Sequence, residues 1–247
     1  MIFGTHKKTS EQIAIALRCG YKIIDTATAY ANEKEIREAI ERTGIVPIII
    51  TKFNPDDFKQ DISNVAKEHI KKLGHTPDII LLHSPMLSND ANIEAFNKLN
   101  EIFTGAIGVS NFDINRIQHL IENNCKPCMV ELEFNPYYQP TKLIEFCLKN
   151  SIEITGYRPL GKGSLCSDKI IENIAKNYGL SIPNMICLWM KSKNITPIIS
   201  STKANNIANN LQLPNIAISD EDIIKLDNLN KGKMGSTCMI KYCNHDE

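Results

Sequence analysis

The sequence lacks an excess of either charge: among its 247 residues, 28 are Lys or Arg and 28 are Asp or Glu. It has no basic run of the kind that follows nucleic-acid phosphates. Its apolar residues occur in short runs, none near the roughly 18 consecutive residues that a membrane helix needs. The opening segment MIFGTHKKTSEQ lacks the apolar core and cleavage site of a secretory signal. We therefore expect a cytoplasmic protein with neither nucleic acid nor a membrane as a partner.

The sequence also has little that indicates a disulfide or metal scaffold, because eight cysteines in a chain of this length do not form a disulfide framework. Cys125-Lys-Pro-Cys128 has the spacing of a redox pair, but it follows a helical pattern, whereas such pairs normally open a helix that lowers the thiol pKa. The tail 238–245, CMIKYCNH, offers two thiols and an imidazole, fewer than the four ligands of a structural zinc site. We expect no metal site, and core thiols at Cys147, Cys166 and Cys187.

What the sequence does contain is a regular alternation of strand and helix patterns. Short runs rich in Ile and Val predict strands over 22–27, 46–53, 78–85, 106–112, 127–135, 153–161 and 196–203. Amphipathic patterns predict helices over 10–20, 33–44, 60–74, 113–124 and 141–150, two segments within 168–193 interrupted at Gly179 and Pro183, and one near 219–230. Residues 2–5 supply an eighth, shortened strand.

Eight strand–helix units of this kind predict a closed (β/α)8 TIM barrel, an α/β fold in which residues 1–247 form one domain. The alternative is an open, doubly wound sheet. No Gly-x-Gly-x-x-Gly follows the first predicted strand, and no acid lies about 20 residues farther on, so the barrel is preferred.

Four polar side chains lie where predicted strands end. Asp25 ends one strand and Tyr30 lies in the loop after it, while Lys52 and His83 end the next two. Each has an ordinary explanation when taken alone: a turn acid, a surface phenol, a lysine with its stem along apolar surface, a hydrogen-bonded histidine. Barrel enzymes bind their substrates at the carboxyl ends of the strands. The four side chains together therefore indicate a shared site.

Several segments resemble, in order and spacing, the aldo-keto reductases, which are barrel enzymes that reduce carbonyls with a nicotinamide cofactor. They are GYKIIDTATAYANEKEI, LLHSP, AIGVSNF, the segment ending in NPYYQ, and GYRPLGKGSL. The resemblance extends from Gly4 to Leu211, and it implies a catalytic tetrad of Asp25, Tyr30, Lys52 and His83. The N-terminal hairpin with which the family closes the bottom of the barrel is not expected here.

Carbonyl reduction needs a hydride on carbon and a proton on oxygen, and the four residues suit the second task. Tyr30 is expected to be the general acid, because a phenol with a pKa of about 10 becomes a better donor when a cation lies beside it. Lys52 supplies the cation, and Asp25 keeps it charged, since an unpaired buried ammonium costs several kcal/mol. His83 is expected to donate a hydrogen bond to the substrate oxygen, worth about 3 kcal/mol.

The resemblance also implies a site for NADPH. It places Ser110 and Asn111 at the nicotinamide carboxamide and Tyr157 against the nicotinamide ring. It assigns the pyrophosphate to a loop containing Leu160, Gly161, Gly163, Ser164 and Leu165, and the adenosine end to Ser201, Lys203 and Asn210.

This chain departs from the family pattern around the cofactor. Glu131 stands where the family usually has Gln near the carboxamide, and it is still expected to contact the cofactor. Arg158 replaces a small Ser, which leaves it to pair with either Glu131 or a phosphate. Ser200 and Asn206 replace basic residues that usually bind the 2′-phosphate, so NADH remains open as a cofactor.

Two alternatives to a reductase remain open. Lys52 would serve as the Schiff-base nucleophile of a barrel aldolase if its pKa were depressed, although Asp25 is expected to keep it charged. A barrel that kept a cofactor pocket for a regulatory or redox-sensing role would have no need of a general acid. The leading prediction is NADPH-dependent reduction of a small aldehyde or ketone by a monomer, with the particular substrate not specified by the sequence.

Overall fold

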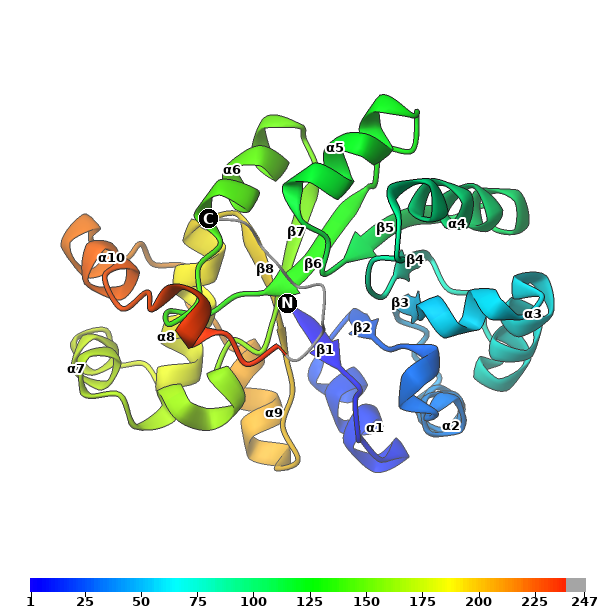
Figure 1. Ribbon diagram of the computed structural model, residues 1–247. Coiled ribbons are helices and arrows are strands. Elements are labelled where there is room, and N and C mark those ends of the chain that lie inside the picture. The colour runs from blue at the N-terminus through cyan, green and yellow to red at the C-terminus, as the bar shows by residue number, and fades with distance from the viewer. Residues whose placement is uncertain (239–247) are drawn as a thin grey trace.

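The computed structural model describes residues 1–238, in which eight parallel strands close into a barrel in chain order (Figure 1). The strands are β1 (Ile2–Gly4), β2 (Ile23–Asp25), β3 (Ile48–Phe53), β4 (Ile79–Leu82), β5 (Ala106–Ser110), β6 (Met129–Glu133), β7 (Glu153–Tyr157) and β8 (Ile195–Ile199). β1 pairs with both β2 and β8, which completes the closure. The predicted (β/α)8 TIM barrel, with its short first strand, is confirmed.

Helices surround the strands and connect each to the next (Figure 1). They are α1 (Ser10–Cys19), α2 (Glu33–Thr43), α3 (Ile62–Leu73), α4 (Asn89–Ile102), α5 (Ile114–Glu122), α6 (Thr141–Lys149), α7 (Lys169–Asn177), α8 (Ile182–Ser192), α9 (Ala204–Leu211) and α10 (Asp220–Asp227). Short 3-10 helices are η1 (Thr28–Tyr30), η2 (Pro55–Lys59), η3 (Gly161–Ser167) and η4 (Gly232–Gly235). α4 and α9 add to the helices predicted from the sequence. None of the helices within residues 1–238 is long and apolar enough to cross a membrane.

The helix ends follow the capping chemistry of the sequence. Thr9 and Gln12 form a capping box at the start of α1, in which the Thr9 hydroxyl accepts the Gln12 N–H at 3.3 Å. Gly20 ends α1 with a φ of 103°, where glycine avoids a Cβ clash. The predicted interruption at Pro183 is wrong. Pro183 lies in the first turn of α8, where the absence of its N–H breaks no helical hydrogen bond.

Alternation along β3 decides which side chains reach the barrel interior. The Thr51 hydroxyl lies 2.8 Å from Nε2 of the buried His69 on α3, so Thr51 points outward and its neighbour Lys52 points inward. An apolar cluster that includes Ile50 fills the barrel beneath Lys52: Ile2, Ile50, Leu81, Met129 and Ile198. Polar side chains therefore gather above this layer, at the carboxyl ends of the strands.

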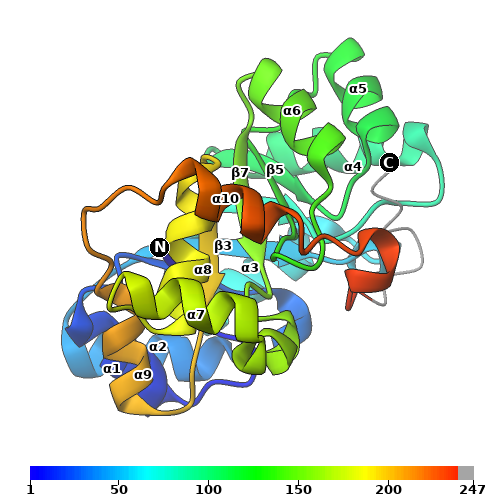
Figure 2. The ribbon, with the colours of Figure 1, turned by 90° about the vertical axis from the view of Figure 1, so that its left-hand side faces the viewer.

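Helices from the last third of the chain pack together outside β7 and β8. α10 lies against α7 (Figure 2). Trp189 of α8 is fully buried, stacks on Phe134 with ring centroids 4.8 Å apart, and donates its Nε1–H to Asp227 of α10 at 2.8 Å. These contacts fix α10, and with it the start of the segment that returns to the barrel mouth.

The core-thiol predictions are confirmed for two of three cysteines. Cys147 and Cys187 are fully buried. Cys166 is exposed, so that prediction is wrong, because the residue lies in the surface segment η3 and not in a helix facing the core.

The Cys125-x-x-Cys128 pair holds two free thiols. Burial raises the pKa of both, to about 11 for Cys128, which disfavours the thiolate that redox chemistry uses. No cluster of metal-ligating side chains occurs within residues 1–238, and Cys243 and His245 of the tail lie outside the described residues.

Candidate active site

The centre of the site is a buried lysine surrounded by oxygen atoms. Lys52 at the end of β3 is fully buried and forms an ion pair with Asp25, the last residue of β2. Its Nζ also donates to the Thr26 carbonyl at 3.0 Å and lies 3.3 Å from Oε1 of Glu131 on β6. Burial lowers the pKa of Lys52, but Asp25 and Glu131 outweigh burial and raise it above its usual value. A permanently charged Lys52 argues against the Schiff-base alternative.

Tyr30 and His83 face the same place. Tyr30 ends η1, the turn after β2, and the centre of its ring lies 5.5 Å from Nζ of Lys52. His83 follows β4, and its ring meets Tyr30 edge-on with centroids 6.0 Å apart. The structure therefore brings all four residues predicted from strand ends to one site. Asp25, Tyr30 and His83 line a pocket of about 570 Å³.

The Tyr30 phenol is a weaker acid here than the sequence led us to expect. Burial raises its pKa to about 12, and Lys52 lowers it only in part, because Asp25 and Glu131 act in the opposite direction. The expected cation is present, but it is also paired with Asp25. The phenol thus stays protonated at neutral pH, which suits a proton donor.

His83 is a neutral imidazole. Burial, followed by repulsion from Lys52, lowers its pKa to about 3. Its Nδ1 is buried without a hydrogen-bond partner within the part of the chain that the structure describes. A buried polar atom of this kind favours a ligand group that can pair with it.

The acids of β6 do not pair as the sequence suggested. Glu131 contacts Lys52, whereas Arg158 lies 3.9 Å from Glu133, so the proposed Arg158–Glu131 pair is wrong. Alternate residues of a strand face the same side, so residues 131 and 133 lie on one face of β6 but in different layers of the barrel. Arg158 follows Tyr157, which is in register with Glu133, so Arg158 lies at the level of Glu133.

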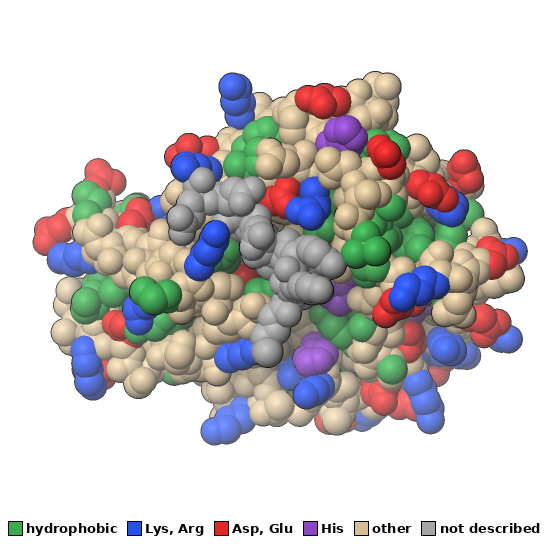
Figure 3. Space-filling model, viewed as in Figure 1, with side chains coloured by type: hydrophobic (Ala, Val, Ile, Leu, Met, Phe, Trp, Pro, Cys, Tyr) green, Lys and Arg blue, Asp and Glu red, His purple; other side chains and the backbone are tan. Residues whose placement is uncertain are grey.

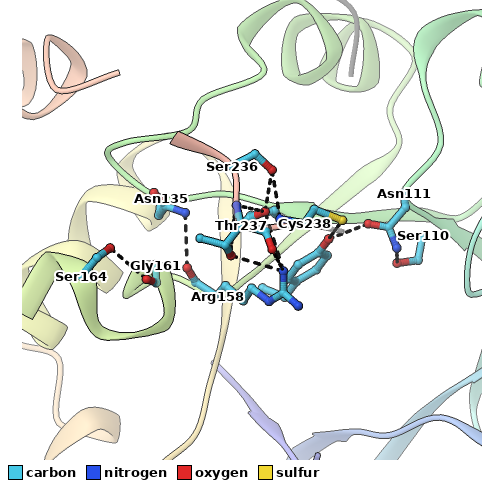
Figure 4. Close-up of polar contacts among 11 residues, drawn as sticks. Ser110, Asn111, Asn135, Arg158, Gly161, Ser164, Ser236, Thr237 and Cys238 are labelled. Atoms are coloured by element: carbon cyan, nitrogen blue, oxygen red, sulfur yellow. Dashed lines mark hydrogen bonds and ion pairs between the residues drawn. The ribbon is translucent and has the colours of Figure 1, made fainter. Parts of the chain in front are cut away.

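The predicted nicotinamide contacts form one connected network (Figure 4). The Tyr157 hydroxyl donates to Oδ1 of Asn111 at 2.6 Å. The Asn111 amide donates in turn to the His83 carbonyl at 2.9 Å and to the Ser110 hydroxyl at 3.0 Å. Asn111 has a φ of 64°, a left-handed conformation that Asn tolerates better than most residues. This network holds the Tyr157 ring at the wall of the pocket.

A segment near the end of the described chain crosses the pocket wall (Figure 4). The fully buried Glu133 accepts the Thr237 N–H at 3.0 Å and the hydroxyls of Thr237 and Ser236 at 2.6 and 2.9 Å. Arg158 donates to the Thr237 carbonyl at 2.8 Å. Sγ of Cys238, which lines the pocket, lies 3.3 Å from the Tyr157 hydroxyl. No sequence pattern predicts this contact, because it joins residues about 80 to 100 positions apart.

The loop after β7 has the backbone expected of a phosphate-binding segment. Gly161 and Gly163 have φ values of 52° and 100°, so both glycines are required by the turn. Leu160 and Gly163 line the pocket, and the Ser164 hydroxyl donates to the Gly161 carbonyl at 2.8 Å. Leu165 is fully buried in the core, so its side chain packs against the barrel instead of facing the pocket.

The residues predicted for the adenosine end lie farther along the same side. Ser201 and Lys203 precede α9, where Lys203 is exposed, and Asn210 is buried near the end of that helix. None of these three lines the described pocket, whereas Ser200 does. Their part in cofactor binding stays a prediction.

The pocket residues that were not identified from the sequence include four basic side chains, His6, Lys7, Lys8 and Lys162. His6 follows β1 and meets the Tyr30 ring with centroids 4.8 Å apart. Burial and Lys7 lower its pKa below the ordinary value. The signal was the run His-Lys-Lys directly after the first strand, at the same end of the barrel as Asp25. On this face Lys and Arg side chains lie beside the visible His side chains, and both basic and acidic side chains are spread around the rim (Figure 3).

The pocket fits a nicotinamide cofactor by its donor set. It combines an aromatic wall at Tyr157, a left-handed glycine loop after β7, and three lysines and an arginine that suit phosphate oxygens. The orphaned polar atoms of His83 and Glu131 lie at its polar end.

The chain belongs to the aldo-keto reductase family, whose family model matches residues 5–231, and it is therefore an oxidoreductase. It is similar to the glyoxal reductase of Bacillus subtilis, with 26% identity over 234 residues that cover 91% of this chain and 84% of the relative. It is 30% identical over 225 residues to the methylglyoxal reductase DkgB of Escherichia coli O157:H7, covering 85% of this chain and 83% of the relative.

Solved structures show the same architecture. The crystal structure of MGS-M4, an aldo-keto reductase from a Medee basin deep-sea metagenome, has a TM-score of 0.89 and 27% sequence identity. The match covers 100% of this chain and 95% of that chain. The family uses NAD(P)H, which agrees with the donor set of the pocket.

Proposed function

We propose that this protein reduces a small aldehyde or ketone to the alcohol with NADPH, and that Tyr30 is the general acid. The observation that carries the proposal is the convergence of Asp25, Tyr30, Lys52 and His83 on one pocket, with Lys52 fully buried. A barrel that only bound a cofactor would gain nothing from a buried ammonium beside a phenol, since burying that charge costs free energy.

A nicotinamide cofactor held beside Tyr157 would supply the hydride to the carbonyl carbon, and the protein's own residues stabilise the charge that builds on the oxygen. Tyr30 transfers its hydroxyl proton to that oxygen, and Lys52 stabilises the phenolate that remains. His83, neutral across the physiological range, donates one N–H to the same oxygen. Asp25 holds the ammonium in place throughout.

Short α-dicarbonyls are the substrate class that we propose, on two grounds. Relatives are named for glyoxal and methylglyoxal. In addition, two imidazoles flank Tyr30, with His6 at 4.8 Å and His83 at 6.0 Å between ring centroids. A dicarbonyl has two adjacent oxygens, so one takes the proton while the second accepts a hydrogen bond from His6.

The choice of NADPH over NADH rests on charge. Four cationic side chains line the pocket, Lys7, Lys8, Arg158 and Lys162, and the additional phosphate of NADPH gives them a further partner. The neutral Ser200 weakens this preference without removing it.

A nucleotide titration followed by a substrate panel tests the proposal. Purified protein is titrated with NADPH and NADH by fluorescence quenching, and NADPH oxidation is then followed with glyoxal, methylglyoxal and longer aldehydes. We expect tighter binding of NADPH and turnover of the dicarbonyls. Binding without turnover would point to a regulatory cofactor-binding barrel, and no binding of either nucleotide would contradict the proposal altogether.

A further inference from the structure

Glu131 is the one acid of the site with no part in the mechanism described above. It is 3% exposed, lies 3.3 Å from the Lys52 ammonium, and lines the pocket. Lys52 has three N–H donors, and three oxygens surround it: those of Asp25, Thr26 and Glu131. The Tyr30 phenol therefore shares the ammonium with two carboxyl groups.

One cation cannot neutralise two buried carboxylates. Asp25, Lys52 and Glu131 are each at most 3% exposed, so the fully ionised cluster would hold one uncompensated negative charge away from water. Such a charge costs several kcal/mol, and buried carboxyl pairs avoid it by keeping a proton. Asp25 and Glu131 both contact the Lys52 ammonium, so the two carboxyl groups are grouped around a single cation.

The proton belongs on Glu131. Asp25 makes the shorter contact with Lys52, and Oε2 of Glu131 is buried with no hydrogen-bond donor reaching it from the described residues. An oxygen without a donor is better satisfied when it carries a proton itself. Burial, and then Asp25, raise the pKa of Glu131 to about 8, while Lys52 acts in the opposite direction.

The charged and titratable groups that face Glu131 are Asp25 from β2, Tyr30 from η1 and Lys52 from β3. With Glu131 neutral, the cluster of Asp25, Lys52 and Glu131 has no net charge. With Glu131 ionised, the cluster carries one negative charge, which opposes the phenolate and the charge on the substrate oxygen during reduction.

We propose that Glu131 is a positioning residue that holds a proton while the enzyme reduces its substrate, and that loss of this proton slows reduction before Tyr30 itself ionises. The inference rests on the proposed carbonyl reduction for its effect on rate, but the buried proton exists whether or not the protein turns over. A glutamine at position 131 is neutral at every pH and preserves the shape of the side chain, so Glu131→Gln imitates the protonated form.

Infrared difference spectroscopy of the purified protein tests the proton directly. We expect the wild type to show a carboxylic-acid band at pH 7 that disappears as the pH rises through about 8. Glu131→Gln should lack the band. The control variant is Glu153→Gln, which changes an exposed acid at the amino end of β7, away from the site, and it should retain the band. Absence of the band from the wild type, or its persistence in Glu131→Gln, overturns the proposal.

The pH dependence of kcat/KM, with methylglyoxal and NADPH as probes, tests the effect on reduction. The kcat/KM of the wild type should fall about tenfold per pH unit above the pKa of Glu131. The kcat/KM of Glu131→Gln should change by less than about twofold over the same pH range. Superimposable profiles for the two proteins overturn the rate effect. If neither protein turns over methylglyoxal, the proposed function fails while the infrared result still decides the protonation of Glu131.

Discussion

The two sides of the pocket are built in different ways. The proton-transfer side includes Asp25, Lys52 and Glu131, which lie on strands and are at most 3% exposed. The proposed cofactor side consists largely of the loop after β7, where Lys162 and Gly163 are exposed. Strand register fixes the first side, since shifting a strand by one residue would turn Lys52 out of the barrel. The second side depends on loop geometry and tolerates changes in sequence.

The largest effect that this comparison predicts is on Tyr30. Tyr30→Phe should lower kcat/KM for methylglyoxal by about 10² to 10⁴, because it removes the proton donor, while the dissociation constant for NADPH changes little. Steady-state kinetics and fluorescence titration measure the two quantities. The control is Tyr178→Phe, which removes a phenol bonded to Asp222 on the outer helices. Reduction by Tyr30→Phe near the wild-type rate would remove Tyr30 from the mechanism.

Replacing Lys52 tests whether the proton-transfer side also supports the fold. Lys52→Met leaves Asp25 and Glu131 buried without a cation, so we expect the free energy of unfolding to fall by about 3 to 5 kcal/mol. The exposed Lys162 is the matched control, and Lys162→Met should change the free energy of unfolding by less than about 0.5 kcal/mol. Urea denaturation measures both. Equal midpoints for the two variants would mean that the buried cluster contributes nothing to stability.

Sequence patterns predicted the strand side of the site well. Asp25, Lys52 and His83 were located because each ends an Ile-rich run, and strand alternation with barrel closure then brings the ends together. The contact between Glu131 and Lys52 was not predicted. Contacts between inward-facing side chains across a barrel depend on the shear of the barrel and on the length of the side chains. The same limit explains why the contact between Arg158 and Glu133 was not predicted, since Glu131 and a phosphate were the two partners considered.

Contacts made by loops were harder to predict. His6 was overlooked because its position directly after the first strand indicates the correct end of the barrel but not its contact with Tyr30, 24 positions away. The attachment of Thr237 to Glu133 depends on the path of the chain around the outside of the barrel. Such contacts have no periodicity and are set by tertiary structure alone.

A substitution on the proposed cofactor side should have a smaller effect, limited to the affinity for NADPH. Lys162→Ala should weaken NADPH binding by about fivefold, or roughly 1 kcal/mol, because an exposed cation at the pocket contributes a screened attraction. The value of kcat should not change. Fluorescence titration at low and high salt measures the effect, which should shrink as salt rises. Lys59→Ala, at an exposed lysine in η2, is the control, and equal affinities for the two variants would show that Lys162 does not reach the cofactor.

A further prediction concerns the pH dependence of stability. Burial lowers the pKa of His83 to about 3 in the folded state, against an ordinary value of 6.5. Below pH 6.5 the unfolded chain binds a proton that the folded chain does not, so this residue makes stability fall as the pH falls. Urea midpoints between pH 7 and pH 5 should decline less steeply for His83→Gln than for the wild type. Parallel declines would show that His83 is protonated in the folded protein.

A crystal structure of the protein with NADP⁺ and an unreactive carbonyl analogue tests the central claim most directly. We predict that the carbonyl oxygen lies within about 2.6–3.2 Å of both the Tyr30 hydroxyl and a ring nitrogen of His83, with Lys52 still paired to Asp25. A carbonyl oxygen bound away from Tyr30, or a nicotinamide ring outside the pocket next to Tyr157, would contradict the account.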